Sequence, residues 1–244
     1  MSDNGNDGIF DIDTLNDIGP ATKSSLKEAG FRSIKDLVIR GPIDIAEATG
    51  IAMEKCTFLC NRARELLEDI GVFDKPFITA NQLYEKRKSE YRITTGSKNL
   101  DELLGGGIET RAITELYGEF GTGKSQICHT LCLTVQEAED KHNISRALYV
   151  DTENTFRPER IASIASARKI DPKHVLENVI VAKAYNSSHQ EVIIQESANI
   201  INLHNIKIMI VDSIVSHYRA EFLGRSFLSE RQQRINRLLH ILLR

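Results

Sequence analysis

Eight consecutive residues, Gly118 to Ser125, match the phosphate-binding pattern G-x-x-x-x-G-K-[ST]. The glycines of such a loop let backbone N–H groups face a polyphosphate, and the following helix adds the partial positive charge of its N-terminus. Lys124 is then expected to hold the β- and γ-phosphates, and Ser125 to place its hydroxyl on Mg²⁺. The predicted nucleotide contacts of this loop are Gly118, Glu119, Phe120, Gly121, Thr122, Gly123, Lys124 and Ser125.

The segments on either side of this loop distinguish a phosphate site from a plain glycine turn. Residues 112–117 are apolar and β-prone, which predicts a buried strand. From Lys124 onward apolar residues recur at helical spacing, which predicts a helix. A strand, a glycine loop and a helix in this order favour nucleotide binding over a glycine turn.

Three acidic residues follow apolar strands and are expected to reach the same nucleotide. Asp212 comes after the strand 208–211, which is typical of a carboxylate that orders Mg²⁺ through its water shell. Asp151 and Glu153 come just after the strand 147–150. We favour Glu153 as the general base that deprotonates the attacking water, and Asp151 as mainly structural. The alternative is that either acid merely caps the following helix.

The pattern from residue 90 to residue 244 predicts an α/β domain. Strands are expected at 91–94, 112–117, 147–150, 179–184 and 208–211, and helices at 100–104, 158–168 and 191–203 as well as after the glycine loop. Strands that alternate with helices predict a parallel sheet covered on both faces. Its ligand crevice should lie at the carboxyl ends of the strands.

Residues 11–70 predict a separate, small all-α domain, preceded by a disordered tail at 1–10 that is rich in Asp, Asn and Gly. Short helical patterns alternate here with glycine breaks, and the turns at 15–21 and 48–51 resemble those of helix-hairpin-helix DNA-binding modules. In such a module backbone N–H groups, with Lys23 and Lys27, contact phosphates without reading bases. A packing module that binds other partners, or none, is the open alternative.

Two further segments carry surface signals. Residues 71–89 form a predicted linker in which the charged run 85–88 indicates a solvated face, whereas the apolar patch 77–80 suits insertion into a neighbouring molecule as an added strand. After Asp212 the chain turns basic. The arginines beyond it indicate either a solvated helix face or a loop, around 219–231, that grips a sugar-phosphate backbone.

Composition limits the class of protein. The 244 residues include 31 basic and 34 acidic side chains, so nucleic-acid binding would have to come from local basic stretches. No apolar run approaches the roughly 20 residues of a membrane span, and the polar, acidic N-terminus is unlike a secretory signal. We therefore predict a cytoplasmic protein without a membrane partner. The four cysteines lack zinc-site spacing and are interpreted as small buried hydrophobes.

Jointly, these motifs resemble the archaeal RadA recombinases, which are related to the eukaryotic strand-exchange recombinases and more distantly to bacterial RecA. The resemblance covers nearly everything after the acidic tail. Besides the two hairpin turns, the segments that carry it are 77–80, 95–97, 100–101, 105–107, 118–125, 151–153, 156–160, 211–213, 219–221, 224–225 and 230–233. It implies a P-loop, RecA-type parallel-sheet core preceded by a small all-α helix-hairpin-helix domain.

The resemblance also implies residue roles. Glu153 would be the catalytic base, acting with Lys124, and Arg160 would stack on adenine. The implied metal-site residues are Ser125 and Asp212, and those of the first DNA-binding loop are Arg219, Arg225 and Arg231. Phe77 and Ala80 would form a polymerisation motif that docks on the next protomer, in a pocket that includes Ala182 and Ala184.

The activity implied by the resemblance is DNA-dependent ATP hydrolysis, with ATP and Mg²⁺ as cofactors. It would be coupled to filament assembly on single-stranded DNA, homology search and strand exchange, in recombination and DNA repair. The implied partners are single-stranded and double-stranded DNA and further copies of the chain, in filaments or rings. A nucleoid-associated, cytoplasmic location follows from the same comparison.

The chain departs from the family pattern at two points. Asn154 stands where the family usually has Gly, and Asn tolerates a positive φ better than most residues. The sequence also stops at Arg244 inside a predicted helix, before further core strands and a second DNA-binding loop. We therefore expect an incomplete core, a fragment of a longer protein that lacks efficient strand exchange and leaves an apolar sheet edge uncovered.

Two other functions stay open at this point. One is a recombinase paralogue or circadian-clock-type ATPase with the same core, although the N-terminal hairpins and the Phe77 motif count against it. The other is a non-catalytic DNA-binding protein or filament modulator that keeps the phosphate loop without turnover. ATP hydrolysis measured with and without single-stranded DNA separates the last from a recombinase.

Overall fold

The computed structural model describes residues 10–15, 18–73, 75, 77–88, 90–137 and 144–243. They divide into two compact units, 1–87 and 88–244. The predicted disordered tail lies outside the described residues except for Phe10, and so does Pro76 of the linker. None of the helices in the described ranges is long and apolar enough to cross a membrane.

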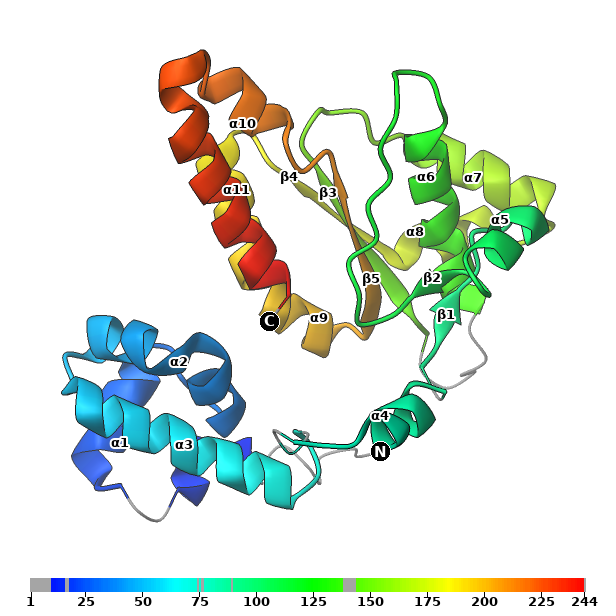
Figure 1. The fold of residues 1–244 in the computed structure, drawn as a ribbon. Coiled ribbons are helices and arrows are strands. Elements are labelled where there is room, and N and C mark those ends of the chain that lie inside the picture. Colours follow the sequence, from blue (N-terminus) through cyan, green and yellow to red (C-terminus); the bar gives the residue numbers. More distant parts are fainter. Residues whose placement is uncertain are drawn as a thin grey trace. The chain divides into compact units, whose positions relative to one another are not determined.

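The first unit is built from helices (Figure 1). They are α1 (Pro20–Glu28), α2 (Ile34–Thr49), α3 (Met53–Asp69) and α4 (Ala80–Arg87), with the short 3-10 helix η2 (Ile12–Thr14). Its core gathers the apolar side chains of η2 and α1 to α3, among them the fully buried Leu26 and Leu67, together with Phe31 from the loop between α1 and α2. The all-α prediction for 11–70 therefore agrees with these elements, whereas their assignment to a helix-hairpin-helix module stays a prediction.

Local sequence signals explain where these helices begin and end. The Ser33 side chain accepts the N–H of Asp36, and the Asp36 carboxylate accepts the N–H of Ser33, so a reciprocal capping box starts α2. At Gly41 the backbone leaves helical geometry, with φ of 79°, which bends α2 just before Pro42. The left-handed Gly50 then ends it.

The second unit contains a parallel, three-stranded sheet (Figure 1). Its strands are β3 (Arg146–Asp151), β4 (Val179–Lys183) and β5 (Ile206–Asp212), in the order β4-β3-β5. The register places Asp151 beside Asp212 at the carboxyl edge. A separate antiparallel pair joins β1 (Arg92–Ile93) to β2 (Ile108–Glu109). The predicted α/β domain with a parallel sheet is confirmed.

Helices cover both faces of this sheet (Figure 1). On one face Tyr149 and Ile210 pack against α6 (Lys124–Thr134), α7 (Pro158–Ala167) and α8 (Pro172–Glu177). On the other face Leu148 and Val150 pack against α9 (Ser187–Leu203). The remaining elements are α5 (Lys98–Leu103), the 3-10 helices η3 (Val135–Glu137) and η4 (Arg225–Phe227), α10 (Ser216–Glu221) and α11 (Leu228–Leu242). Because successive side chains of β3 point to opposite faces of the sheet, this strand contributes to both hydrophobic cores.

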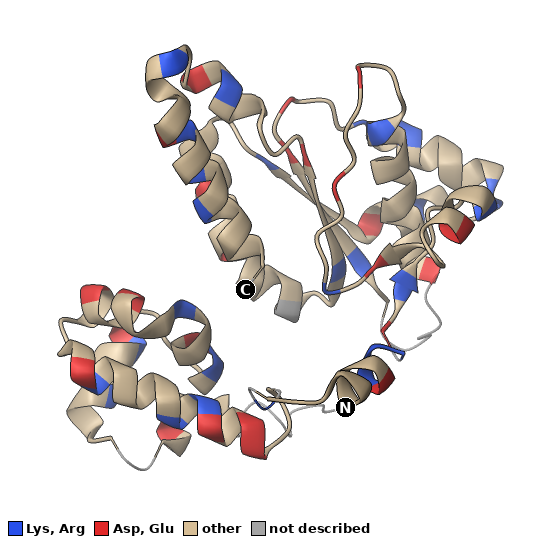
Figure 2. Cartoon of the chain, viewed as in Figure 1, with Lys and Arg blue, Asp and Glu red and all other residues tan. Residues whose placement is uncertain are grey.

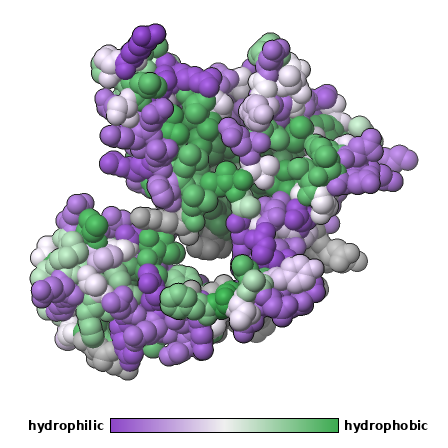
Figure 3. Space-filling view, in the orientation of Figure 1, coloured by the Kyte–Doolittle hydropathy of each residue, from purple (hydrophilic) through white to green (hydrophobic). Residues whose placement is uncertain are grey.

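The predicted strand at 112–117 is wrong for this structure. Within the described residues the segment has no strand partner and runs as an irregular trace into α6 (Figure 1). Ile113 is 48% exposed and Tyr117 is 89% exposed. High β propensity does not form a strand without a ladder of hydrogen bonds beside it. Among the described strands, β5 pairs only with β3. The view in Figure 3 shows an apolar area on the surface of the second unit.

Candidate functional site

The phosphate-loop residues form a turn that encloses the Lys124 ammonium. Gly123 has a φ of 92° and stands directly before α6, a conformation that favours glycine. The Lys124 Nζ donates to the carbonyl oxygens of Gly118 at 2.9 Å and Glu119 at 2.8 Å. Thr122 Oγ1 donates to the Glu119 carbonyl at 2.9 Å and tightens the loop. The predicted contacts therefore form one compact loop at the N-terminus of α6, as an anion site requires.

Ser125 and Asp212 meet although 87 positions separate them in sequence. The Ser125 Oγ donates to Asp212 Oδ2 at 2.7 Å, because Ser125 lies in the first turn of α6 and Asp212 ends β5. A hydroxyl and a carboxylate are hard oxygen donors, the kind that suits Mg²⁺ near phosphates. The donor chemistry at this edge of the sheet therefore fits the predicted Mg-nucleotide.

Tyr149 reaches the same carboxylate, which sequence reasoning missed. Its hydroxyl donates to Asp212 Oδ2 at 2.7 Å, from a fully buried position on β3. Burial raises the pKa of Tyr149, and the hydrogen bond to Asp212 raises it further, so the phenol stays protonated. Its only sequence signal was a polar tip in an apolar strand, two residues before Asp151.

Asp151 shapes the turn that presents Glu153. Its buried carboxylate accepts backbone N–H groups from Glu153 at 3.2 Å, Thr155 at 3.1 Å and Phe156 at 3.1 Å. Asn154 adopts a φ of 56° within this turn, as expected for the residue that replaces Gly. The predicted structural role of Asp151 is confirmed.

The predicted base Glu153 is exposed and lies close to the end of β5. Its Oε1 accepts a hydrogen bond from Ser213 Oγ at 2.9 Å, directly after Asp212. Thr152 holds the two loops together, since its Oγ1 donates to the Ser213 carbonyl and accepts the Ser213 N–H, both at 2.7 Å. The carboxylates of Glu153 and Asp212 therefore lie at the same edge of the sheet.

Arg160, the predicted adenine contact, lies beside the phosphate-loop helix. Its Nε donates to the side-chain oxygen of Gln126, in the first turn of α6. Both side chains are exposed, and Arg160 belongs to the first turn of α7. The two helices thus bring a guanidinium next to the loop, as stacking on a base requires.

An aromatic layer lies beneath the Asp212 carboxylate. The Tyr149 ring stacks on His129 of α6, with centroids 5.6 Å apart, and meets Phe156 at 4.8 Å. His129 is buried, and neither ring nitrogen has a hydrogen-bond partner among the described residues. Burial lowers the pKa of His129, so the ring is neutral in the folded chain. This layer links α6, β3 and the turn after Glu153.

The three predicted DNA-binding arginines fall on consecutive elements after β5. Arg219 lies in α10, Arg225 in η4 and Arg231 in α11, where basic residues gather (Figure 2). Arg219 and Arg225 are exposed, and Arg231 is half-buried. None of the three forms an ion pair with another part of the described chain. Their position on one side of the unit is compatible with a shared anionic partner.

Arg234 does not fit a solvated helix face, which is one of the two interpretations of the arginines after Asp212. Its Nε donates to Glu191 Oε1 at 3.0 Å, and its guanidinium lies 5.1 Å from the centre of the Phe222 ring. The same Glu191 oxygen accepts the hydroxyl of the buried Tyr218 at 3.0 Å. Since α9, α10 and α11 converge here, the half-buried Arg234 joins these helices and its charge is paired with Glu191.

The predicted polymerisation residues lie in both units. Phe77 is 92% exposed, and the exposed Ala80 begins α4. In the second unit Ala182 is half-buried in β4, and Ala184 is 6% exposed just after it. Ala184 lines a pocket of about 370 Å³ together with Asp151, Thr152, Glu153, Asn154, Lys183, Tyr185 and His217.

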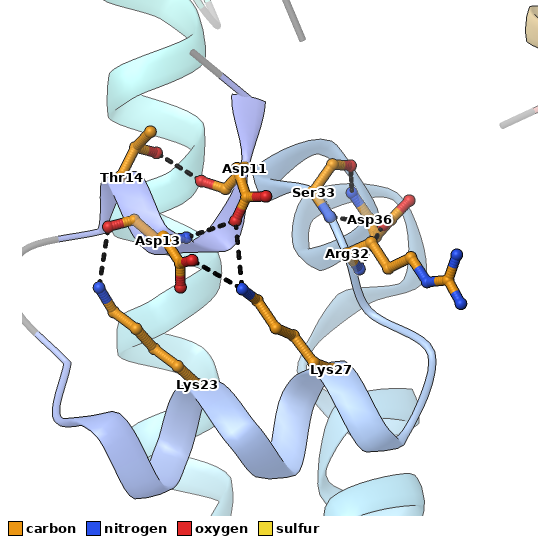
Figure 4. Close-up of polar contacts among 8 residues, drawn as sticks. All are labelled: Asp11, Asp13, Thr14, Lys23, Lys27, Arg32, Ser33 and Asp36. Carbon is orange, nitrogen blue, oxygen red and sulfur yellow. Dashed lines mark hydrogen bonds and ion pairs between the residues drawn. The ribbon is translucent and has the colours of Figure 1, made fainter. Parts of the chain in front are cut away.

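The two lysines predicted to touch DNA in the first hairpin are engaged within the chain (Figure 4). Lys27 Nζ lies 2.7 Å from Asp13 Oδ2 and 3.6 Å from Asp11 Oδ1. Lys23 Nζ donates to the Asp13 carbonyl at 2.8 Å. The hydrogen bond to Asp13 raises the pKa of Lys27. Both ammonium groups therefore have partners within the chain, and their contact with DNA phosphates stays a prediction.

The cysteines are unpaired thiols in the two cores. Cys56, Cys60 and Cys132 are buried, and burial raises the pKa of Cys60 to about 11. In the described ranges no cluster of three or more His, Cys, Asp or Glu side chains is placed to hold a metal ion. The interpretation as small buried hydrophobes is confirmed for Cys56, Cys60 and Cys132, whereas Cys128 is half-buried at the edge of its core.

Comparison with known proteins places the chain in a family. The model of the Rad51 family matches residues 86–244. Three relatives named DNA repair and recombination protein RadA are 45 to 46% identical to the chain. They come from Cenarchaeum symbiosum, Metallosphaera sedula and Aeropyrum pernix, and the aligned regions are 236, 238 and 237 residues long, respectively. The matches cover 96 to 97% of this chain.

The relatives are longer than the chain. The match spans 59% of the Cenarchaeum protein and 72% of each of the other two. The family match covers the phosphate loop, Glu153 and Asp212. It also covers the three arginines predicted to bind DNA. From the family match and the shared identity we conclude that this chain belongs to the Rad51 family.

Proposed function

We propose that the chain is the ATP-binding part of a DNA-dependent ATPase that promotes homologous strand exchange in recombination and DNA repair. The observation that carries this proposal is the meeting of Ser125, Asp212 and Glu153 at one edge of the sheet, next to the phosphate loop. The names of the RadA relatives support the choice of DNA repair over other nucleotide-dependent functions. Single-stranded and double-stranded DNA and further copies of the chain would be its partners.

The nucleotide-binding role belongs to the loop and the first turn of α6. Lys124 now donates to two loop carbonyls, and its ammonium would turn toward the β- and γ-phosphates when ATP enters. Ser125 and Asp212 would hold Mg²⁺, which, when bound, neutralises charge on the phosphate oxygens. Arg160 would stack on the adenine.

Glu153 would act as the general base on the attacking water. Its carboxylate is exposed, so solvent reaches it, and Ser213 Oγ orients one of its oxygens. The Asp151 turn fixes the backbone on which Glu153 stands. A base held in this way can accept a proton from water with little reorganisation.

The remaining roles concern DNA and assembly. Arg219, Arg225 and Arg231 would contact the sugar-phosphate backbone, and the all-α unit would bind DNA through its turns. Phe77 with Ala80 would dock on a neighbouring copy at Ala182 and Ala184, giving filaments or rings. Such a protein would work on DNA in the cytoplasm, at the nucleoid.

ATP hydrolysis with and without single-stranded DNA tests the catalytic assignment. Glu153→Gln should lower kcat by about 10²–10⁴-fold while nucleotide binding persists, because only the base is removed. Glu177→Gln, on the surface at the end of α8, is the matched control and should keep wild-type kcat. Unchanged hydrolysis in Glu153→Gln would refute the role of Glu153. ATP binding without any hydrolysis by the wild type would favour a non-catalytic filament modulator.

The DNA assignment is tested by the salt dependence of binding to single-stranded DNA. Arg225→Glu should reduce the slope of log K against log salt by about 1, because a phosphate contact is lost. Lys173→Glu reverses a charge on the exposed side of α8, away from the arginines, and should leave the slope unchanged. An unchanged slope for Arg225→Glu would remove Arg225 from the DNA site.

A further inference from the structure

We propose that Tyr149 is a positioning residue of the metal site. Its hydroxyl fixes the rotation of the Asp212 carboxylate and thereby sets the affinity of the nucleotide complex for Mg²⁺. The inference rests on the proposed function, since it concerns the same Mg-nucleotide. It adds a buried residue of β3 that acts through Asp212.

The geometry at Asp212 carries the inference. Oδ2 accepts two hydrogen bonds of 2.7 Å, from Ser125 Oγ and from Tyr149 OH. Oδ1 accepts no hydrogen bond within the described part of the chain. Oδ2 is thus fixed by two donors, whereas Oδ1 points away from both of them. Once the Ser125 hydroxyl serves the cation, Tyr149 is the remaining side-chain donor that restrains Oδ2.

The Tyr149 hydroxyl is itself held in place by packing. The residue is 0% exposed, and its ring packs against His129, with centroids 5.6 Å apart and 10° between planes, and against Phe156, at 4.8 Å and 56°. The rings of His129 and Phe156 also contact each other at 5.6 Å, so the three rings form one cluster. Strand register pairs Tyr149 with Ile210, two positions before Asp212, so the phenol extends along the sheet to the carboxylate. Partners that orient metal ligands in this way change metal affinity when removed.

A second buried tyrosine provides a matched control. Tyr218 is also 0% exposed, and it also donates to a carboxylate, that of Glu191 at 3.0 Å. This bond lies where α10 and α11 meet α9, with Arg234 as the third member. Tyr218→Phe therefore removes a comparable buried hydrogen bond that does not involve Asp212. A loss of general stability affects both variants, whereas a loss of metal positioning affects only Tyr149→Phe.

The test uses the 244-residue chain and the fluorescent nucleotide mant-ADP. Binding is measured first in EDTA and then across a Mg²⁺ titration. For Tyr149→Phe we expect an affinity for mant-ADP in EDTA within twofold of that of the wild type. The Mg²⁺ midpoint, which is the Mg²⁺ concentration that gives half of the Mg-dependent gain in affinity, should be about 10-fold higher than in the wild type. Tyr218→Phe should keep the wild-type Mg²⁺ midpoint. Circular dichroism spectra establish that each variant is folded.

A double-mutant cycle locates the effect. In an Asp212→Asn background, Tyr149→Phe should shift the Mg²⁺ midpoint by less than twofold, because both changes act on one carboxylate. A folded Tyr149→Phe with the wild-type midpoint overturns the inference and leaves the proposed function intact. So does an equal shift in Tyr218→Phe. A wild type that binds mant-ADP neither with nor without Mg²⁺ overturns the proposed function itself, and the inference with it.

Discussion

Replacement of Asp151 by Asn should loosen the turn that carries Glu153. In the structure Oδ1 accepts the N–H groups of Glu153 and Thr155, and Oδ2 accepts that of Phe156. An asparagine offers one acceptor oxygen, and its NH₂ group would face the third backbone donor. Loss of that acceptor costs about 1–3 kcal/mol, and the other two bonds change from charged to neutral, at about 1 kcal/mol each.

The sum is about 3–5 kcal/mol, which corresponds to an increase of about 100- to 4,000-fold in the opening equilibrium of the turn. Hydrogen exchange of the backbone amides at Glu153, Thr155 and Phe156 measures this directly and separates the turn from the rest of the chain. Asp171→Asn is the matched control, because Asp171 caps α8 through the Lys173 N–H and Asn caps equally well. Exchange in Asp151→Asn that rises by less than twofold would refute the reasoning.

Three further changes test other parts of the structure. Because burial lowers the pKa of His129, its contribution to stability is complete above pH about 6.5 and declines as pH falls through the lowered pKa of the folded state. His129→Phe should therefore make Tm less dependent on pH below pH about 6.5. An unaltered dependence of Tm on pH would contradict this. Ser33→Ala should lower the free energy of unfolding of the first unit in urea by about 1 kcal/mol, because the N-cap of α2 is lost. Ser24→Ala, which removes no cap, is the control and should not cause this loss. Arg234→Met should cost about 1–2 kcal/mol, whereas the exposed Arg237→Met should cost nothing measurable.

The sequence was most informative where a residue type and an element boundary coincide. Ser125 begins a helix after a glycine loop, and Asp212 ends an apolar strand, so parallel topology alone brings them to one edge. The register of Asp151 beside Asp212 follows from the same rule. Helix α9 shows the limit of periodicity, because it begins at Ser187, capped by Asn186, and not at the predicted Glu191.

Features that depend on tertiary partners were not predictable. Residues 112–117 have the composition of a strand, but strand formation depends on a neighbour that no local pattern specifies. The hydrogen bond from Tyr149 to Asp212 joins two strands through a side chain that reads as core. Arg234 reads as a surface charge on α11, and only the approach of α9 and α10 turns it inward.

Calorimetric titration with Mg-ATP tests the central claim most directly, namely that the loop from Gly118 to Ser125 holds the phosphates of a nucleotide. We predict saturable binding to the wild type, an about 10–100-fold loss of affinity in Lys124→Ala, and wild-type affinity in the surface control Lys173→Ala. A Lys124→Ala protein that is folded like the wild type and binds Mg-ATP equally tightly would contradict the account.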